Sequence, residues 1–313
     1  MAHIVASGAL YGGSHNLLHY TLKRLGIETN FVASHDLDAW RAAARPNTRL
    51  FFGETLGNPG LDVLDIAGVA EIAHEHGVPL LVASTFTTSY LLRPFEHGAD
   101  LVYHSATKFL GGHGTTIGGV LVWWMAAPSI SSRAAAFPNS PSLTTAFTAW
   151  CSPRKTPSRP SCCACREGLR DFGACLHPQA AWQLLQGIET LPLRMDRHVA
   201  NTRKVIEFLL SSPAVEGVAY PELPTHRDHG SPGVCCRAAR ARCSALTCAA
   251  ARRFIESLSL FSHLANVGDV RSLVIHPAWT PPCSRRRASG RDASGCRSDR
   301  KIPTILSTTS NAA

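Results

Sequence analysis

Several features that would place this chain in a class at once are missing from its sequence. No stretch approaches the uninterrupted apolar length that a membrane-spanning helix needs. The start, MAHIVASGALYGG, has no charged region followed by a long apolar run, so the sequence predicts no signal peptide. We therefore expect a soluble protein in a reducing, cytoplasmic setting.

Aromatic residues are missing from the basic parts of the chain. The formal net charge is +9, and the excess of arginine lies in residues 237–253 and 285–301. A protein that binds single-stranded nucleic acid interleaves aromatic side chains with its basic residues, because bases stack on them. Neither segment contains an aromatic residue, so we expect no nucleic-acid partner. A basic nucleic-acid-binding protein stays as a third reading, which rests on these two segments alone.

A second cysteine pair at metal-binding spacing is also missing. Ten of the eleven cysteines lie in residues 151–165, 235–248 and 283–296, and Cys162 and Cys165 form a lone CxxC motif. Zinc sites of this kind need two further ligands, a second such pair or histidines at a set offset. The sequence therefore predicts unpaired thiols and no metal site.

Apolar runs and helical patterns alternate over the first part of the chain. Runs at 49–54, 78–84, 99–106 and 118–124 predict strands, and the spacing of apolar residues over 61–77 predicts a helix. Strands that alternate with helices predict an α/β fold with a mostly parallel sheet. Ligands of such sheets bind beyond the carboxyl ends of the strands, and Glu54, Ala83, Ser84 and Ser105–Lys108 fall at those ends.

Changes in composition and in apolar pattern divide the chain into four parts. Residues 1–127 predict a large domain. Residues 128–166 are rich in Ser, Pro, Thr, Cys and Arg and predict a disturbed junction. Residues 167–277 predict a helical connection, amphipathic over much of its length, and a partial C-terminal α/β domain. An irregular basic tail follows over 278–313.

Lysine is rare in this chain, with five residues against twenty-six arginines, and one lysine lies in SATKFLGG (105–112), directly after a predicted strand. This block and several others resemble the trans-sulfuration family of pyridoxal-phosphate (PLP) enzymes of cysteine and methionine metabolism, with most likeness to its O-acetylhomoserine sulfhydrylases. The resembling stretches are LYGGSHNL (10–17), ETLGNPGLDVLDI (54–66), residues 85–122, LLQGIETLPLRMDRH (184–198) and FSHLANVGDVRSLVIHPA (261–278).

The resemblance implies an aspartate-aminotransferase-like (fold type I) large domain and a role for each matching residue. Lys108 matches the lysine that holds PLP as an internal Schiff base and acts as a base. Ser105 and Thr107 match the hydroxyls that bind the cofactor phosphate. Tyr11 matches the tyrosine that stacks on the pyridine ring, and Asn58 the asparagine near the ring's 3′ oxygen.

At Ala83 the sequence departs from the family. The family strand ends here with an aspartate whose charge pairs with the pyridine nitrogen and favours the protonated ring. The protonated ring is the stronger electron sink. Because an alanine side chain can neither donate nor accept, we expect carbanion chemistry to be weakened while capture of the cofactor by Lys108 survives. Ser84 should point to the opposite face of the strand.

Both ends of the sequence also depart from the family. Family members carry a segment ahead of the YGG block that holds a Tyr-x-Arg pair and a phosphate-binding loop, and this sequence begins at Met1 close to that block. After HPA (276–278) the family continues with a segment leading to an arginine that clamps the substrate carboxylate. None of the arginines that follow residue 278 can be assigned to that role.

Three segments with abrupt boundaries share an excess of Arg, Cys, Ser, Pro and Ala: 128–166, 231–251 and 278–313. Our hypothesis is that they are read in a shifted frame from GC-rich coding DNA, which would make their charge and thiols accidental. Resequencing the locus tests this, and an uninterrupted frame with the same codons contradicts it.

The resemblance implies a PLP-dependent transferase or lyase. Its reaction would join O-acetylhomoserine and sulfide, or a thiol, to give homocysteine or methionine plus acetate. It also implies an amino-acid substrate and a homo-oligomer, a tetramer in the family. A second reading is a catalytically inert remnant of the family that retains PLP binding.

Overall fold

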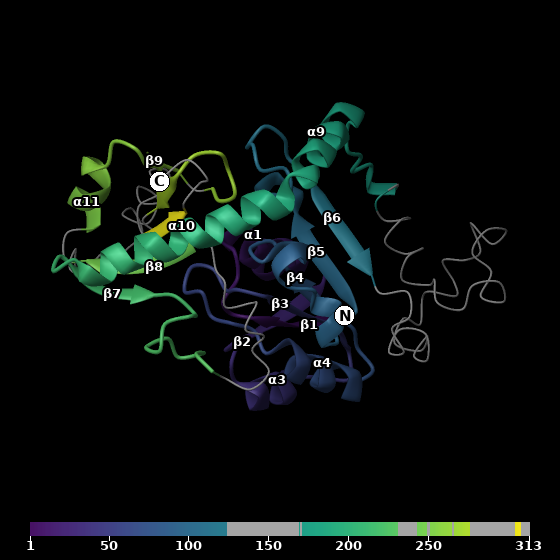
Figure 1. Ribbon diagram of the computed structural model, residues 1–313. Helices are drawn as coiled ribbons and strands as arrows, with labels where there is room; N and C mark the ends of the chain where they lie inside the picture. The colour runs from purple at the N-terminus through teal and green to yellow at the C-terminus, as the bar shows by residue number, and fades with distance from the viewer. Residues whose placement is uncertain are drawn as a thin grey trace, which may run out of the picture.

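The computed structural model describes residues 1–123, 169, 171–230, 243–248, 251–264, 266–275 and 304–307. These segments form two sheets joined by a long helix (Figure 1). The junction expected over 128–166 lies outside the described residues, as does most of the basic tail. The lone CxxC motif at Cys162 and Cys165 also lies outside them.

The larger sheet has six strands in the order β2-β1-β3-β4-β5-β6. Strands β1 to β5 pair in parallel, and β6 pairs with β5 antiparallel. This arrangement confirms the predicted α/β fold with a mostly parallel sheet. The strands are β1 (Ala2–Ser7), β2 (Ile27–Val32), β3 (Thr48–Glu54), β4 (Leu80–Ala83), β5 (Leu101–Ser105) and β6 (Gly119–Trp123).

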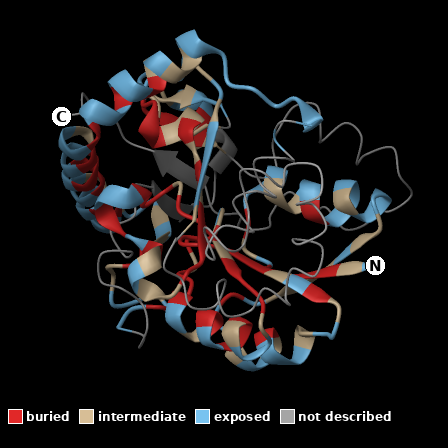
Figure 2. Ribbon diagram, turned by 90° about the vertical axis from the view of Figure 1, so that its right-hand side faces the viewer, coloured by how far each residue is buried: buried red, intermediate tan, exposed pale blue. Residues whose placement is uncertain are grey.

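Helices connect these strands and cover the sheet. Helices α3 and α4 lie together along one side of it (Figure 1). Their outer surfaces are exposed, while the central strands β1, β3, β4 and β5 are largely buried (Figure 2). The helical segments here are α1 (Gly12–Asn16), η1 (Leu17–Thr21), α2 (Leu22–Arg24), α3 (Leu37–Ala43), α4 (Ile66–Glu75), α5 (Thr88–Leu91), η2 (Pro94–His97) and η3 (Ala106–Leu110).

The helix predicted over residues 61–77 is shorter than its apolar spacing indicated. Residues 57–63 form a loop instead, in which Leu61 has a positive φ of 60° and Val63 bridges to Leu56. The helix begins at Ile66, because Asp65 caps it by accepting a hydrogen bond from the backbone N–H of Gly68 at 3.0 Å. The leucines before Ile66 are buried by the loop and not by a helix face.

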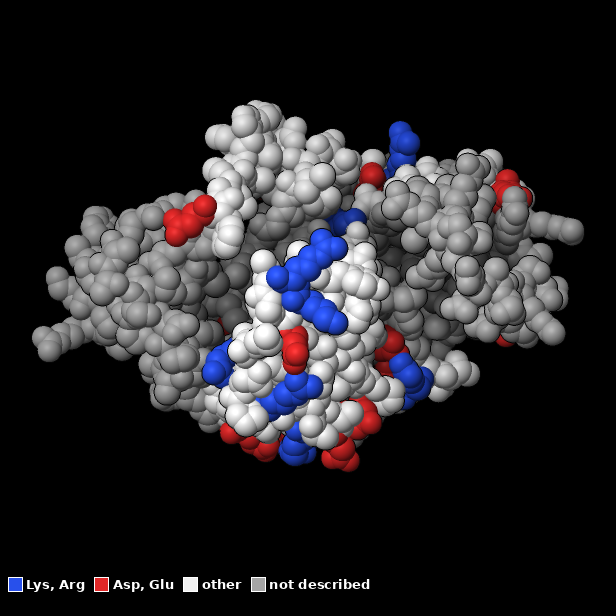
Figure 3. Space-filling model, turned by 180° about the vertical axis from the view of Figure 1, so that it is seen from behind, with Lys and Arg blue, Asp and Glu red and all other residues white. Residues whose placement is uncertain are grey.

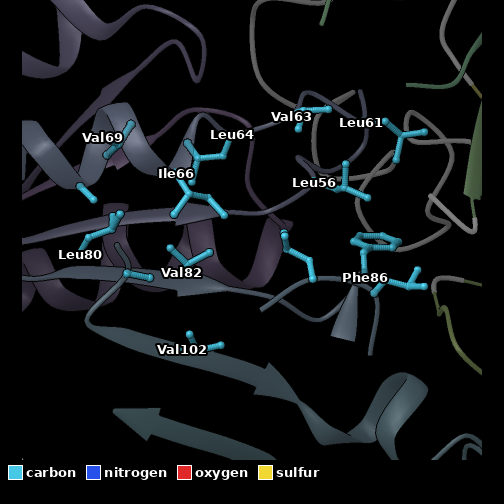
Figure 4. Close-up of a cluster of buried hydrophobic side chains, with 14 of the residues drawn as sticks. Leu56, Leu61, Val63, Leu64, Ile66, Val69, Leu80, Val82, Phe86 and Val102 are labelled. Carbon is cyan, nitrogen blue, oxygen red and sulfur yellow. The ribbon is translucent and has the colours of Figure 1, made fainter. Parts of the chain in front are cut away.

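The main hydrophobic core lies between the sheet and helix α4 (Figure 4). Leu80 and Val82 of β4 and Val102 of β5 point toward Ile66 and Val69 of the helix, and all five side chains are buried. A smaller cluster, which includes Ile4, Phe52 and Ala83, covers the opposite face of the sheet. The central strands β1, β3, β4 and β5 are therefore largely buried on both faces, which is the environment that parallel sheets require.

The second sheet has the strand order β7-β8-β11-β10-β9 and follows two helices that contact each other. Helix α10 runs from α9 to this sheet, where it contacts β7 and β8 (Figure 1). The elements are α9 (Pro178–Glu189), α10 (Leu191–Ser211), β7 (Val215–Ala219), β8 (Cys243–Cys248), α11 (Ala251–Ser257), β9 (Ser262–His263), β10 (Leu273–Ile275) and β11 (Thr304–Ser307).

Charged side chains of both signs lie among one another on the face shown in Figure 3. Residues 285–301 and the side chains of residues 237–253, on which the nucleic-acid-binding reading rests, lie outside the described residues. Within the described ranges, no helix is long and apolar enough to cross a membrane. In the same ranges, no group of three His, Cys, Asp or Glu side chains is placed to hold a metal ion.

Replacing Leu80 by alanine tests the packing of the central strand. Leu80 is fully buried against helix α4, so Leu80→Ala removes apolar contacts and leaves a cavity. We expect the free energy of unfolding to fall by about 2–5 kcal/mol in urea denaturation followed by circular dichroism. The matched change Leu25→Ala, at a side chain that is 71% exposed, should shift it by less than about 0.5 kcal/mol. Equal effects of the two changes would contradict this packing.

Candidate active site

A cavity of about 380 Å³ lies at the carboxyl ends of strands β3, β4 and β5. Its floor includes Glu54, Ala83 and Ser105, which are the last residues of those three strands. Asn266 and Ile275, from the part of the chain that forms the second sheet, close another side. The cavity therefore occupies the position at which parallel sheets bind ligands.

Lys108 reaches the cavity from the turn η3 that follows strand β5. The neighbouring side chains of Ala106, Phe109 and Leu110 are buried and anchor this turn in the core. Lys108 itself departs from helical geometry, with φ −87° and ψ −123°, and its side chain is half-buried. The turn is thus held by its apolar residues, and the lysine is the one that faces the cavity.

Burial lowers the pKa of the Lys108 amine, and the negative charge of Asp269 partly offsets this effect. Desolvation disfavours the charged form, so this amine is neutral more often than an exposed lysine at the same pH. Its Nζ donates a hydrogen bond to the side-chain oxygen of Asn266. A neutral amine is the nucleophilic form, so Lys108 is suited to attack an aldehyde.

Gly268 allows the Asn266 segment to lie against the lysine. Gly268 is buried with φ +75°, and a Cβ atom added there would lie 2.6 Å from the backbone nitrogen of Phe109. On the other side of the turn, a Cβ at Gly187 in helix α9 would lie 2.2 Å from the carbonyl oxygen of Gly111. Backbone contacts therefore hold the lysine turn between two segments that are distant in the sequence.

Four of the five site residues expected from the sequence line the cavity: Lys108, Ser105, Tyr11 and Asn58. Thr107 is not among its lining residues. Its hydroxyl donates to the carbonyl oxygen of Gly118 at 3.2 Å and accepts from the backbone N–H of Gly118 at 3.0 Å. Thr107 thus ties the lysine turn to the start of strand β6, and its predicted contact with a phosphate stays a prediction.

Ala83 places a methyl group on the cavity wall, between the two neighbouring strand ends. Ser84 does not line the cavity. It is fully buried, and its hydroxyl forms a hydrogen bond of 2.8 Å with the hydroxyl of Thr87. Ser84 therefore lies on the opposite face, as the alternation of a strand predicts, and is not available to replace the missing carboxylate.

Glu54 was placed at a strand end by the sequence but was not predicted as a site residue. It is 8% exposed, lines the cavity, and accepts a hydrogen bond of 2.9 Å from the backbone N–H of Tyr11. Burial raises its pKa to about 7, and the hydrogen bond from Tyr11 partly opposes this rise. An acid at the end of a buried strand was the signal that could have identified it.

Asn266 was also missed, since 158 positions separate it from Lys108 and no local pattern marks it. It lies in the stretch FSHLANVGDVRSLVIHPA (261–278), which resembles the family, but the resemblance assigned no role to this residue. The structure adds that its amide oxygen contacts the amine of Lys108. Only the packing of the loop between β9 and β10 against the lysine turn brings the two residues together.

The raised pKa of Glu54 predicts a pH dependence of stability in the absence of added ligand. The unfolded chain loses this proton near pH 4.5 and the folded chain near pH 7, so the free energy of unfolding falls as pH rises between these values. Glu54→Gln cannot ionise and should remove this fall, which makes the variant more stable than the original protein by about 3 kcal/mol at pH 8. Urea denaturation at pH 5 and pH 8 measures the difference. The exposed control Glu71→Gln should keep the original pH slope, and the same slope in Glu54→Gln would refute this account.

This chain is similar to known proteins over most of its length. The family described as Cys/Met metabolism PLP-dependent enzyme matches residues 2–299. An O-acetyl-L-homoserine sulfhydrylase of Leptospira meyeri is 43% identical over 290 residues, which cover 88% of this chain and 65% of that protein. A homocysteine synthase of Schizosaccharomyces pombe is 40% identical over 294 residues, covering 88% of this chain and 66% of the relative. The chain thus spans about two thirds of the length of these curated relatives.

A solved structure shares the fold over almost the whole chain. A Campylobacter jejuni protein described as an O-acetylhomoserine (thiol)-lyase matches with a TM-score of 0.80 and 30% identity, covering 98% of this chain and 72% of that one. That crystal structure contains a lysine carrying a pyridoxyl monophosphate group. The predicted fold type I is confirmed by this likeness and by the mostly parallel sheet. The chain therefore belongs to the Cys/Met metabolism family of PLP-dependent enzymes.

Proposed function

We propose that this chain is a PLP-dependent enzyme that replaces the γ-acetoxy group of O-acetylhomoserine by sulfide or a thiol. With sulfide the products would be homocysteine and acetate. The observation that carries the proposal is a half-buried amine, that of Lys108, on the wall of a cavity at the carboxyl edge of the sheet. The names of the similar proteins support the choice of substrate.

The groups around the cavity fit the cofactor at most of its positions. Lys108 would hold the aldehyde carbon, and the hydroxyl of Ser105 is a candidate for the phosphate. The ring of Tyr11, which is 52% exposed at the cavity, offers a flat face for the pyridine ring. Asn58, half-buried on the same wall, can donate to the ring oxygen. The ring nitrogen is the one position where a family partner is replaced by a methyl group, at Ala83.

In this function the cofactor supplies an electron sink for the carbanion that forms at the substrate's Cα. The chain's own part is proton transfer and orientation. Nζ of Lys108 can accept a proton from Cα, because its lowered pKa keeps the neutral amine available. The side chain of Asn266 touches this amine, and its amide N–H₂ group can donate to the substrate carboxylate. Among the described lining residues there is no arginine to take that part.

A second candidate is a family remnant that binds PLP without turnover, and Ala83 is the observation that favours it. Its methyl group cannot hold a proton on the ring nitrogen, so it would weaken the electron sink without removing Lys108. The two candidates differ in acetate release from O-acetylhomoserine. Both predict a visible absorption band when PLP is added.

The proposal extends to assembly and location. We propose a homo-oligomer, supported by exposed apolar side chains on two adjacent helices: Trp182 and Leu185 on α9, and Leu193 on α10, each more than half exposed. We propose a reducing cytoplasmic setting, supported by Cys175, an exposed free thiol among the described residues. Analytical ultracentrifugation tests the first part, and a monomer at micromolar concentration contradicts it.

The change Lys108→Arg tests the assignment of the amine. Arginine keeps a positive charge but cannot join the cofactor, so the visible band of bound PLP should disappear. Acetate release with sulfide should fall by at least about 100-fold, the minimum usually lost with a general base. The exposed lysine Lys23 provides the matched control, and Lys23→Arg should change neither quantity.

The pattern of results separates the candidates. Acetate release that depends on Lys108 supports the enzyme. A visible band that depends on Lys108, with acetate release no faster than in Lys108→Arg, contradicts the enzyme and supports the remnant. A band that persists in Lys108→Arg contradicts the placement of the cofactor in this cavity.

A further inference from the structure

Three residues in register form a row across the ends of the central strands. Glu54 of β3 pairs with Ala83 of β4, and Ala83 pairs with Tyr103 of β5. Residues paired in register on neighbouring strands point to the same face, and the strands lie about 4.8 Å apart. All three side chains line the cavity. A carboxyl group therefore lies one strand away from the methyl group of Ala83.

Glu54 is the one acid among the described residues that line this cavity. In the part of the chain that the structure describes, its carboxyl accepts one hydrogen bond, from the backbone N–H of Tyr11. A carboxylate has room for about four such contacts, so most of its capacity is unused. A buried carboxylate is costly unless it is paired with a donor or a cation. The cavity side of Glu54 thus has the chemistry of a receptor for a positively charged N–H group.

The other polar neighbours of Ala83 do not supply a charge of this kind. Ser84 points away from the cavity and is bonded to Thr87. Burial raises the pKa of Tyr103, so its phenol is neutral at ordinary pH and can offer only an uncharged hydrogen bond. Glutamate is one methylene longer than aspartate, which extends its reach from the neighbouring strand. The carboxylate of Glu54 is therefore the best placed group to replace the aspartate that the family has at the position of Ala83.

We propose that Glu54 supplies the negative charge for the pyridine nitrogen of bound PLP, in place of the carboxylate that Ala83 does not provide. This inference rests on the proposed function of the cavity. It gives Glu54 a positioning and charge-pairing role toward the cofactor. A charge-assisted hydrogen bond between carboxylate and pyridinium N–H would hold the ring protonated. The electron sink would then be retained despite Ala83.

Nitrogen-15 NMR of the full chain with ¹⁵N-labelled PLP reports directly on the ring nitrogen, because pyridine and pyridinium have separate chemical shifts. At neutral pH we expect the pyridinium shift in the original protein and the neutral pyridine shift in Glu54→Gln. Glutamine keeps the size of the side chain and an oxygen that can accept from Tyr11. Loss of the pyridinium shift in this variant would therefore report on the charge of Glu54 and not on its packing. The dissociation constant for PLP should rise on the order of 10- to 100-fold in the same variant.

Two further variants complete the test. Glu54→Gln combined with Ala83→Asp returns a carboxylate to the neighbouring strand and should restore the pyridinium shift, which also shows that the background folds. Tyr103→Phe removes the phenol but keeps Glu54, so its nitrogen should remain protonated. A pyridinium shift in Glu54→Gln overturns the proposal, and so does its loss in Tyr103→Phe.

The same samples separate this inference from the proposed function. If the original protein shows the visible band of bound PLP but a neutral ring nitrogen, the role of Glu54 is overturned while cofactor binding stands. If the original protein shows no band at saturating PLP, cofactor binding and the role of Glu54 are both overturned.

Discussion

The parallel, in-register pairing of strands β3, β4 and β5 is the constraint on which the site depends. Because all three strands run in one direction, Glu54, Ala83 and Ser105 meet at a single edge of the sheet. The turn that carries Lys108 leaves the same edge directly after Ser105. Burial of the strands on both faces holds this edge in place. The chemistry of the cavity follows from which side chains happen to end the strands.

Desolvation acts on the two ionisable ends of the cavity in opposite directions. It lowers the pKa of the Lys108 amine and raises that of the Glu54 carboxyl to about 7, so both groups move toward their neutral forms. A ligand that brings an aldehyde to the lysine and a cationic N–H to the glutamate would use both effects. PLP is such a ligand, so the chemistry of the cavity agrees with the PLP-dependent family to which the chain belongs. Under the proposal, the negative charge that pairs with the ring nitrogen lies on Glu54, one strand away from Ala83.

The sequence predicted the parts of this structure that depend on local pattern. Strands β4 to β6 lie within the expected apolar runs, and β3 begins one residue before its run. Lys108 was expected after a strand at the ligand-binding edge, and it follows β5. The predicted helix over 61–77 began too early, since apolar spacing cannot distinguish buried leucines of a loop from those of a helix. The cap at Asp65 would have corrected it.

The parts that the sequence did not predict depend on long-range pairing. The contact between Lys108 and Asn266 joins the turn after β5 to the loop between β9 and β10. The hydroxyl of Thr107 bonds to Gly118 because strand β6 turns back along β5. The sequence shows that Glu54 ends a buried strand, but its register with Ala83 on the neighbouring strand depends on how the strands pair.

Borohydride reduction of the protein with PLP, followed by peptide mapping, tests the central claim most directly. The chain has five lysines, and their positions make the result unambiguous. We predict a single pyridoxyl group, on the peptide that contains Lys108. A pyridoxyl group spread over the other lysines, or none at all, would contradict the placement of the cofactor in this cavity.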